Sequence, residues 1–269
     1  MSDYTTRSEP VGIERDLNGK AIRADAASKT EMLLADLWVE LVSARARVIA
    51  NFNTSTRCFL VLDDHPRATS CEPAPLAHID QRNVEILRRV LRGDAQKVIA
   101  MDLHLSPSSV SAVAGQTLRS MGLRCVPTRV PVVVLMAAHA HYQEIDSLTA
   151  RQSMVVAAEK RYRILSVPRP DPSGITVLSD AERSVVDLLL ERRSNAEIAR
   201  LRATSPRTVA NQLANVVQKL RVGGRCGIVH RLICAPGKYW SAQMAFGAKP
   251  ANSSVETEAK HLGNVSEWA

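Results

Sequence analysis

Aromatic residues and long apolar runs are scarce in this chain of 269 residues. Aromatic side chains make up 4% of the sequence, so a core has to be built mainly from leucine, valine, isoleucine and alanine. No stretch approaches the ~20 consecutive apolar residues that a membrane-spanning helix needs. Residues 1–29 lack the apolar segment of a secretory signal and mix acidic with basic side chains. The sequence therefore predicts a cytoplasmic protein without membrane contact.

Cysteine pairs with a recognisable spacing are also lacking. The five cysteines contain no C-x-x-C pair, which argues against a disulfide framework or a zinc ribbon and favours free, mostly buried thiols. His139 and His141 fall on one side of a predicted strand, but no third ligand lies near them in the sequence. Packed or loop histidines are therefore expected, with no metal and no other cofactor.

No arrangement of residues typical of catalysis is present. Asp63, Asp64 and His65 form a small acidic cluster, but they sit in a stretch rich in turn formers, where aspartate commonly bonds its own backbone. Serine, cysteine and histidine do not assemble into a recognisable triad. The chain is not expected to be an enzyme.

Basic residues exceed acidic ones. The formal net charge is +8 and the isoelectric point is near 9.5, which favours a polyanionic partner, either a nucleic acid or an anionic membrane surface. The apolar share of 45% is that of a globular protein.

An internal repeat is the strongest signal in the sequence. Residues 79–125 and 178–224 match in one ungapped register, 99 residues apart. The matching pairs are Ile99-Ala100 with Ile198-Ala199, Ser106-Pro107 with Ser205-Pro206, and Val110 with Val209. Each copy predicts three short helices.

The second copy predicts a helix-turn-helix. Ser179 caps its first helix, Ser194 and Glu197 form a capping box for the second, and Ser205-Pro206 starts the third. The buried face of the third helix is predicted from Val209, Leu213, Val217 and Leu220. Its opposite face carries side chains that can read base edges in a major groove, namely Arg207, Thr208, Asn211, Gln212 and Asn215, with Lys219 near the end. Phosphate contacts are expected from Arg183, Arg193, Arg200 and Arg221.

The first copy keeps the same start signals with fewer polar side chains. Asp80 and Asp94 are expected as helix caps, Gly93 as the turn, and Val110, Ala114, Leu118 and Met121 as the buried face of the third helix. A second DNA contact would come from Ser108, Ser109, Gln116 and Arg119. A fourth helix is not expected, because Pro127 and a predicted buried strand at 132–136 take its place. A degenerate copy kept for packing or dimerisation is favoured over a second reader of DNA.

The second copy resembles the DNA-binding domain of LuxR-type transcriptional regulators over residues 178–232. The residues that carry the resemblance are Leu178, Ser179, Glu182, Ser194, Asn195, Glu197, Ile198, Ala199, Ser205, Pro206, Arg207, Thr208, Val209, Lys219, Leu220, Val222 and Arg225. The resemblance implies a four-helix helix-turn-helix whose last helix, at about 225–232, often mediates dimerisation. Four positions depart from the family pattern. Arg202 replaces a core leucine and Ala203-Thr204 replaces Gly-Ile, which bears on the packing of the turn. Ala210 replaces a lysine and Gln212 a histidine, which bears on the base preference.

The remaining segments predict a small sheet around the first copy. A helix is expected from Thr30, hairpins at 48–62 and 154–167, and a stiff linker through Pro168, Pro170 and Pro172. We expect a mainly helical α+β fold, with two tri- or tetra-helical helix-turn-helix units and a small antiparallel sheet between and around the first. The expected domains are a flexible arm at 1–28, an α+β region at 29–172 enclosing 79–125, a DNA-binding domain at 173–235 and a flexible tail at 236–269.

Together these features predict a sequence-specific transcriptional regulator that binds double-stranded DNA through its C-terminal unit. We expect a homodimer on a roughly palindromic site, and RNA polymerase is a further candidate partner. The alternative is an interaction protein whose helical units bind a sigma factor or RNA polymerase instead of DNA.

Overall fold

A computed structural model describes most of the chain between its two ends. The described residues are 14–15, 21–22, 30–63, 79–145, 148–157 and 160–234. The arm expected at 1–28 lies outside them except for two short paired strands, β1 (Glu14–Arg15) and β2 (Ala21–Ile22). The expected tail at 236–269 and the loop residues Asp64 and His65 also lie outside them. Within the described stretches, no helix combines the length and the apolar character needed to cross a membrane.

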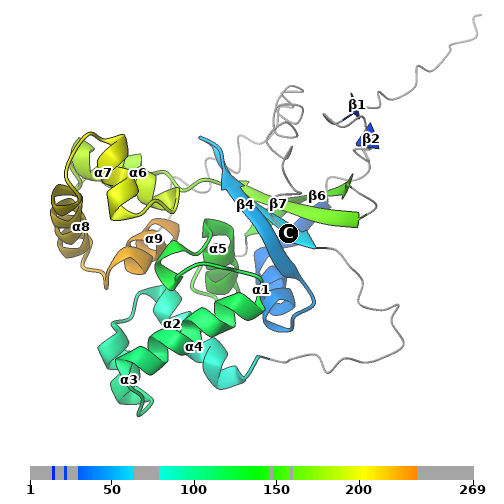
Figure 1. The fold of residues 1–269 in the computed structure, drawn as a ribbon, viewed down its shortest axis with the longest axis horizontal. Coiled ribbons are helices and arrows are strands. Elements are labelled where there is room, and N and C mark those ends of the chain that lie inside the picture. The colour runs from blue at the N-terminus through cyan, green and yellow to red at the C-terminus, as the bar shows by residue number, and fades with distance from the viewer. Residues whose placement is uncertain are drawn as a thin grey trace, which may run out of the picture.

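A five-stranded antiparallel sheet joins segments from both sides of the first repeat copy (Figure 1). Its strands, in spatial order, are β3 (Thr30–Leu33), β6 (Thr149–Ala157), β7 (Lys160–Pro168), β5 (Arg57–Asp63) and β4 (Arg47–Asn53). Both predicted hairpins are confirmed, because β4 pairs with β5 and β6 pairs with β7. The pairing of β5 with β7 makes the first copy an insertion between two strands of one sheet. The fold is α+β and mainly helical, as predicted.

The N-terminal helix begins four residues later than predicted. Thr30–Leu33 forms β3, which pairs with β6, and only then does α1 (Leu34–Val42) start. The helical spacing of apolar residues is nevertheless confirmed, because Leu34, Leu37, Trp38 and Leu41 are buried. Pairing with the distant strand β6 decided the conformation of Thr30–Leu33, and the sequence of this segment alone does not indicate that partner.

The buried strand predicted at 132–136 is wrong, because this segment is helical. After a short 3₁₀ helix, η1 (Pro127–Arg129), the chain forms α5 (Val132–His141), whose residues 132–140 are all buried. Helix α5 packs against α1 and β5. A short apolar run without periodicity fits a buried helix as well as a buried strand, and the alanines that follow favour the helix. The first copy does lack a helix equivalent to α9, as predicted, but η1 and the start of α5 take its place, not a strand.

The two repeat copies form helices that begin 99 residues apart. The first copy contains α2 (Gln81–Arg92), α3 (Gln96–Asp102) and α4 (Pro107–Ser120), and the second contains α6 (Asp180–Leu190), α7 (Asn195–Leu201), α8 (Pro206–Leu220) and α9 (Arg225–Ile233). The turns repeat as well, because residues with positive φ occupy equivalent positions in both copies. These pairs are Gly93 with Arg192, His104 with Ala203, and Gly122 with Arg221. The repeat is thus a property of the backbone as well as of the sequence.

Most local predictions for the first copy are confirmed. Asp80 accepts a bond from the backbone N–H of Arg82, and Ser106 accepts one from the N–H of Ser109. The predicted inward residues of α4 are buried, namely Val110, Ala114, Leu118 and Met121. The cap predicted at Asp94 is wrong: helix α3 begins after Ala95, and the Asp94 carboxylate instead accepts from Arg89 Nε at 2.9 Å.

The cysteines that the structure describes are free thiols, as predicted. Cys71 lies outside the described residues. Cys58 and Cys226 are buried, and Cys125 and Cys234 are half-buried. Burial raises the pKa of Cys58 to about 12 and that of Cys226 to about 11, so both remain protonated near neutral pH.

The two copies meet where the backbone of α9 approaches the turn after α2. A Cβ atom added at Gly93 would lie 2.6 Å from both Cα and N of Gly227, and one added at Gly223 would lie 1.9 Å from the Gly93 carbonyl oxygen. Both distances are far below van der Waals contact. Helix α9 therefore lies between its own helices and the first copy, as its orange ribbon shows in Figure 1, and the buried residues of both parts form one continuous core.

Gly93→Ala is expected to lower the free energy of unfolding by roughly 2–4 kcal/mol, because it adds a strained positive φ and a clash with Gly227. Gly115→Ala is the matched control. Its new Cβ would meet only the mobile end of Arg119, at 3.4 Å, and the gain in helix propensity is up to about 1 kcal/mol. Urea denaturation of both variants measures the difference. Equal stability of the two variants would contradict a close approach at Gly93.

Candidate nucleic-acid interface

Local capping bonds fix where α7 and α8 begin. Ser194 accepts from the backbone N–H of Glu197 at 3.2 Å, while the Ser194 N–H donates back to the Glu197 carboxylate at 2.7 Å. Ser205 accepts from the N–H of Thr208 at 3.0 Å, and Pro206 occupies the first helical position. A Ser179–Glu182 box starts α6 in the same way. All three predicted start signals of the second copy are confirmed.

Helix α8 packs on a slightly different face from the one predicted. Val209 and Leu213 are buried as expected, but the third buried residue is Val216. Val217 and Leu220, which were predicted to be buried, are only partly covered and lie at the edge of the core.

The opposite face of α8 is free at its N-terminal half. Arg207, Thr208, Asn211 and Asn215 are exposed. Among the described residues, no hydrogen bond or ion pair occupies the side chains of Arg207, Asn211 or Asn215, and Thr208 bonds only its neighbour Ser205. Helix α8 lies at the outer edge of the molecule, far from the sheet (Figure 1). Nothing described covers these groups.

Two other side chains predicted on this face have intramolecular partners. Gln212 is half-buried and accepts a bond from Arg202 Nη1 at 2.6 Å. Arg202 stands where the family resemblance leads us to expect a core leucine, and it holds the Gln212 side chain of α8 in place. Lys219 donates to the Glu182 carboxylate at 2.7 Å. Burial raises the pKa of Glu182, but bonds from Lys219 and Ser179 outweigh it and hold the pKa below its ordinary value.

The expected phosphate-binding cations differ in their availability. Arg200 and Arg221 are exposed, with no ion pair in the described part of the chain, whereas the half-exposed Arg193 lies 3.5 Å from Glu191. Arg183 donates to the carbonyl oxygens of Leu178 and Ile175 and pairs with an aspartate. Its guanidinium therefore holds the segment before α6 in place.

The first copy presents a weaker version of the same surface. Ser108, Gln116 and Arg119 are exposed on α4, and Ser109 is half-buried. The hydroxyls of Ser108 and Ser109 both lie within 2.8 Å of the Ser106 hydroxyl, so the first turn of α4 is bonded to itself. Ala112 stands at the position equivalent to Asn211 in α8.

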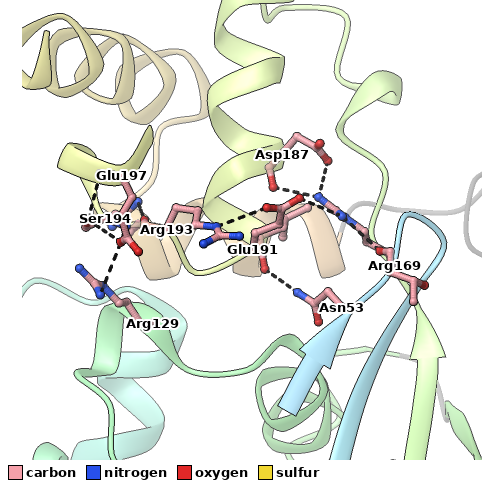
Figure 2. A network of polar contacts seen from close by, with 11 residues as sticks. Asn53, Arg129, Arg169, Asp187, Glu191, Arg193, Ser194 and Glu197 are labelled. Atoms are coloured by element: carbon pink, nitrogen blue, oxygen red, sulfur yellow. Dashed lines mark hydrogen bonds and ion pairs between the residues drawn. The ribbon is translucent and has the colours of Figure 1, made fainter. Parts of the chain in front are cut away.

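Sequence reasoning missed the polar contacts that hold the second copy to the sheet and to η1 (Figure 2). The Arg169 side chain, only 8% exposed, donates to the Asp187 carboxylate at 2.7 Å and lies 3.6 Å from the Glu191 carboxylate. Asn53, in the β4–β5 hairpin, donates to the Leu190 carbonyl oxygen at 3.0 Å, and Arg129 lies 3.9 Å from Glu197. The expected stiff linker after β7 is thus bonded directly to α6.

The histidine pair considered in the sequence is not a pair in the structure. His139 and His141 both lie on α5, but His139 is buried and His141 is exposed against Tyr142. His139 instead faces His230 of α9, with ring centroids 4.5 Å apart. Histidine 230 had no signal in the sequence, because it becomes a neighbour only through the packing of α9.

Comparison with known proteins agrees with this geometry. Residues 176–232 match the family model of bacterial regulatory proteins of the luxR family. The match runs from just before α6 to the last turn of α9 and does not include the first copy. No curated protein and no solved structure matches the chain. Residues 176–232 therefore form a helix-turn-helix domain of the luxR family of bacterial regulatory proteins.

Proposed function

We propose that this chain regulates transcription by reading duplex DNA in a sequence-specific manner through α8. The observation that carries the proposal is the exposed polar face formed by Arg207, Asn211 and Asn215, which has no partner among the described residues. It belongs to α8, a helix at the outer edge of the molecule (Figure 1). Arginine pairs with guanine and asparagine with adenine in the major groove. Thr208, at the first turn of α8, is placed to bond a base or a phosphate.

The proposed phosphate contacts come from Arg200 in the last turn of α7, Arg193 just before α7 and Arg221 at the C-cap of α8. Within the described part of the chain, no hydrogen bond or ion pair holds the guanidinium groups of Arg200 and Arg221, and Arg193 has a long contact with Glu191. Gln212 and Lys219 stay in the proposed interface, but each has to exchange its contact with Arg202 or Glu182 for one with DNA. We therefore expect them to contribute less than Arg207 and Asn211.

A homodimer, which the family resemblance predicts, is proposed to form through a surface other than the inner face of α9. That face carries Cys226, Gly227 and His230, and it lies against Pro127, Gly93 and His139 of the same chain. Sedimentation of the protein with a palindromic duplex counts the bound chains. Two chains per duplex are expected, and a single chain would overturn the homodimer.

The first test selects the operator from a library of randomised duplexes with the full chain. Arg207→Ala and Asn211→Ala should each weaken binding to the selected duplex by roughly 5–150-fold, the equivalent of about 1–3 kcal/mol. Both side chains are exposed, so the melting temperature should not change. If no motif is enriched, or if both variants bind normally, the proposal is overturned and an interaction protein that binds a sigma factor or RNA polymerase takes its place.

The second test separates phosphate binding from structural support by the salt dependence of binding. Arg200→Ala should reduce the slope of log K against log salt concentration by about 1, because one phosphate contact is lost. Arg183→Ala should leave that slope unchanged and lower the melting temperature, because Arg183 bonds two backbone carbonyls. A reversed pattern would contradict the assignment of the two arginines.

The third test asks whether the first copy reads DNA, and it uses equivalent positions of the repeat. Asn215→Ala in α8 should weaken binding to the selected duplex, whereas Gln116→Ala, 99 residues earlier in α4, should change affinity by less than about 2-fold. Ser108→Ala should behave like Gln116→Ala. A large loss of affinity in either first-copy variant, with an unchanged thermal melt, would show that both copies contact DNA.

A further inference from the structure

Two histidines and a cysteine form a cluster between α5 and α9. Helix α5 belongs to the segment inserted between β5 and β6, called the inserted region below, and α9 belongs to the DNA-binding domain. His139 lies near the end of α5, while His230 lies on α9 and Cys234, four residues later, is the C-cap of that helix. The ligand atoms that these three side chains offer all lie within 4.8 Å of one another. Ligands of a tetrahedral zinc ion are about 3.5 Å apart, so side-chain movements of about an ångström would bring all three into coordination distance.

Nε2 of His139 is the atom of this cluster that most strongly indicates a missing ligand. The side chain is 2% exposed, and Nε2 has no hydrogen-bond partner in the described part of the chain. The other ring nitrogen, Nδ1, lies 2.7 Å from the Glu144 carboxylate. When Nδ1 carries the proton and donates it to Glu144, Nε2 keeps a free lone pair. A buried polar atom without a partner is costly in a folded protein, and an ion at this position would remove the cost.

Burial changes the pKa of all three side chains of the cluster. It lowers the pKa of His139 to about 4 and also lowers the pKa of His230. The Cys234 thiol, whose pKa burial raises to about 11, has to release its proton when it binds an ion. The Glu144 carboxylate adds negative charge beside the cluster, and its other oxygen is 3.1 Å from Arg88.

The ligand set selects the kind of ion. Two imidazole nitrogens and one thiolate suit a borderline or soft ion, whereas magnesium and calcium take oxygen ligands. Three protein ligands leave one tetrahedral position for water or a carboxylate. We propose that His139, His230 and Cys234 bind a zinc ion that links α5 to α9 and so ties the inserted region to the DNA-binding domain.

Cobalt is the first probe, because Co²⁺ replaces Zn²⁺ and a cobalt–thiolate bond gives a charge-transfer band in the near ultraviolet. The full chain is titrated with Co²⁺ in the absence of DNA, so the result does not depend on the proposed function. One equivalent is expected to produce the band, and excess Zn²⁺ is expected to remove it. No band, or a band that Zn²⁺ does not displace, would overturn the proposal.

Four variants locate the site. Cys234→Ser should abolish the band, and His230→Gln should weaken Co²⁺ binding by at least about tenfold. The matched controls are Cys125→Ser, which removes another half-buried thiol, and His141→Gln, which removes an exposed histidine two residues from His139. Both controls should bind like the wild type. If Cys234→Ser gave the same Co²⁺ titration as the wild type, the ion would bind elsewhere and the proposal would be overturned.

Thermal unfolding gives a second readout that does not use cobalt. Zinc at about 100 times its dissociation constant should raise the melting temperature of the wild-type chain by roughly 5–10 °C. Cys125→Ser should show the same increase and His230→Gln should show none. Circular dichroism of each variant without metal verifies that the fold is intact. An equal increase in His230→Gln and the wild type would contradict a zinc link between α5 and α9.

Discussion

The close approach of two glycine-containing segments is the constraint on which the arrangement of the two repeat copies depends. The turn at Gly93 and the start of α9 at Gly223 and Gly227 leave no room for a Cβ atom between them. Since backbone meets backbone here, α9 packs against α2 as well as against its own domain. That packing brings His230 to His139 and the Cys226 thiol to the carbonyl of Pro127, at 3.4 Å.

Contacts at the other end of the domain complete the attachment. Arg169 and Asn53 bond the C-terminal part of α6 to the sheet, and Arg192 reaches Asn51 and the Arg129 carbonyl oxygen. Arg192 has a positive φ at the position equivalent to Gly93. A left-handed conformation strains a residue with a Cβ, and the bonds of its side chain offset that strain. The two copies therefore share one backbone turn for different reasons: Gly93 permits an approach, while Arg192 makes contacts.

The basic residues of the C-terminal domain carry the same charge but differ in whether their side chains already have an intramolecular partner. Arg169 and Arg183 hold the structure together, whereas Arg200 and Arg207 have no partner among the residues that the structure describes. An ion pair that is already formed has to be broken before the cation can meet a phosphate, which reduces its contribution to binding. The net charge of the chain gives no such distinction, because it counts structural and free cations alike.

The sequence by itself determined the features that depend on neighbouring residues. The starts of α6, α7 and α8 follow from Ser179, Ser194 and Ser205, since a cap bonds a backbone group only two or three positions away. The hairpins and the repeat were predictable for the same reason: turn formers and apolar spacing act over short distances. The exposed face of α8 followed from helical periodicity.

Only the tertiary structure decided what depends on distant partners. Thr30–Leu33 became a strand because β6 pairs with it, and residues 132–141 became a helix whose residues 132–140 are buried against elements that include α1 and β5. The meeting of His139 with His230 and Cys234 has the same origin, since 91 residues separate the two histidines. Propensity and spacing describe a segment within its own turn or strand, whereas these features were set by the surfaces against which each segment packs.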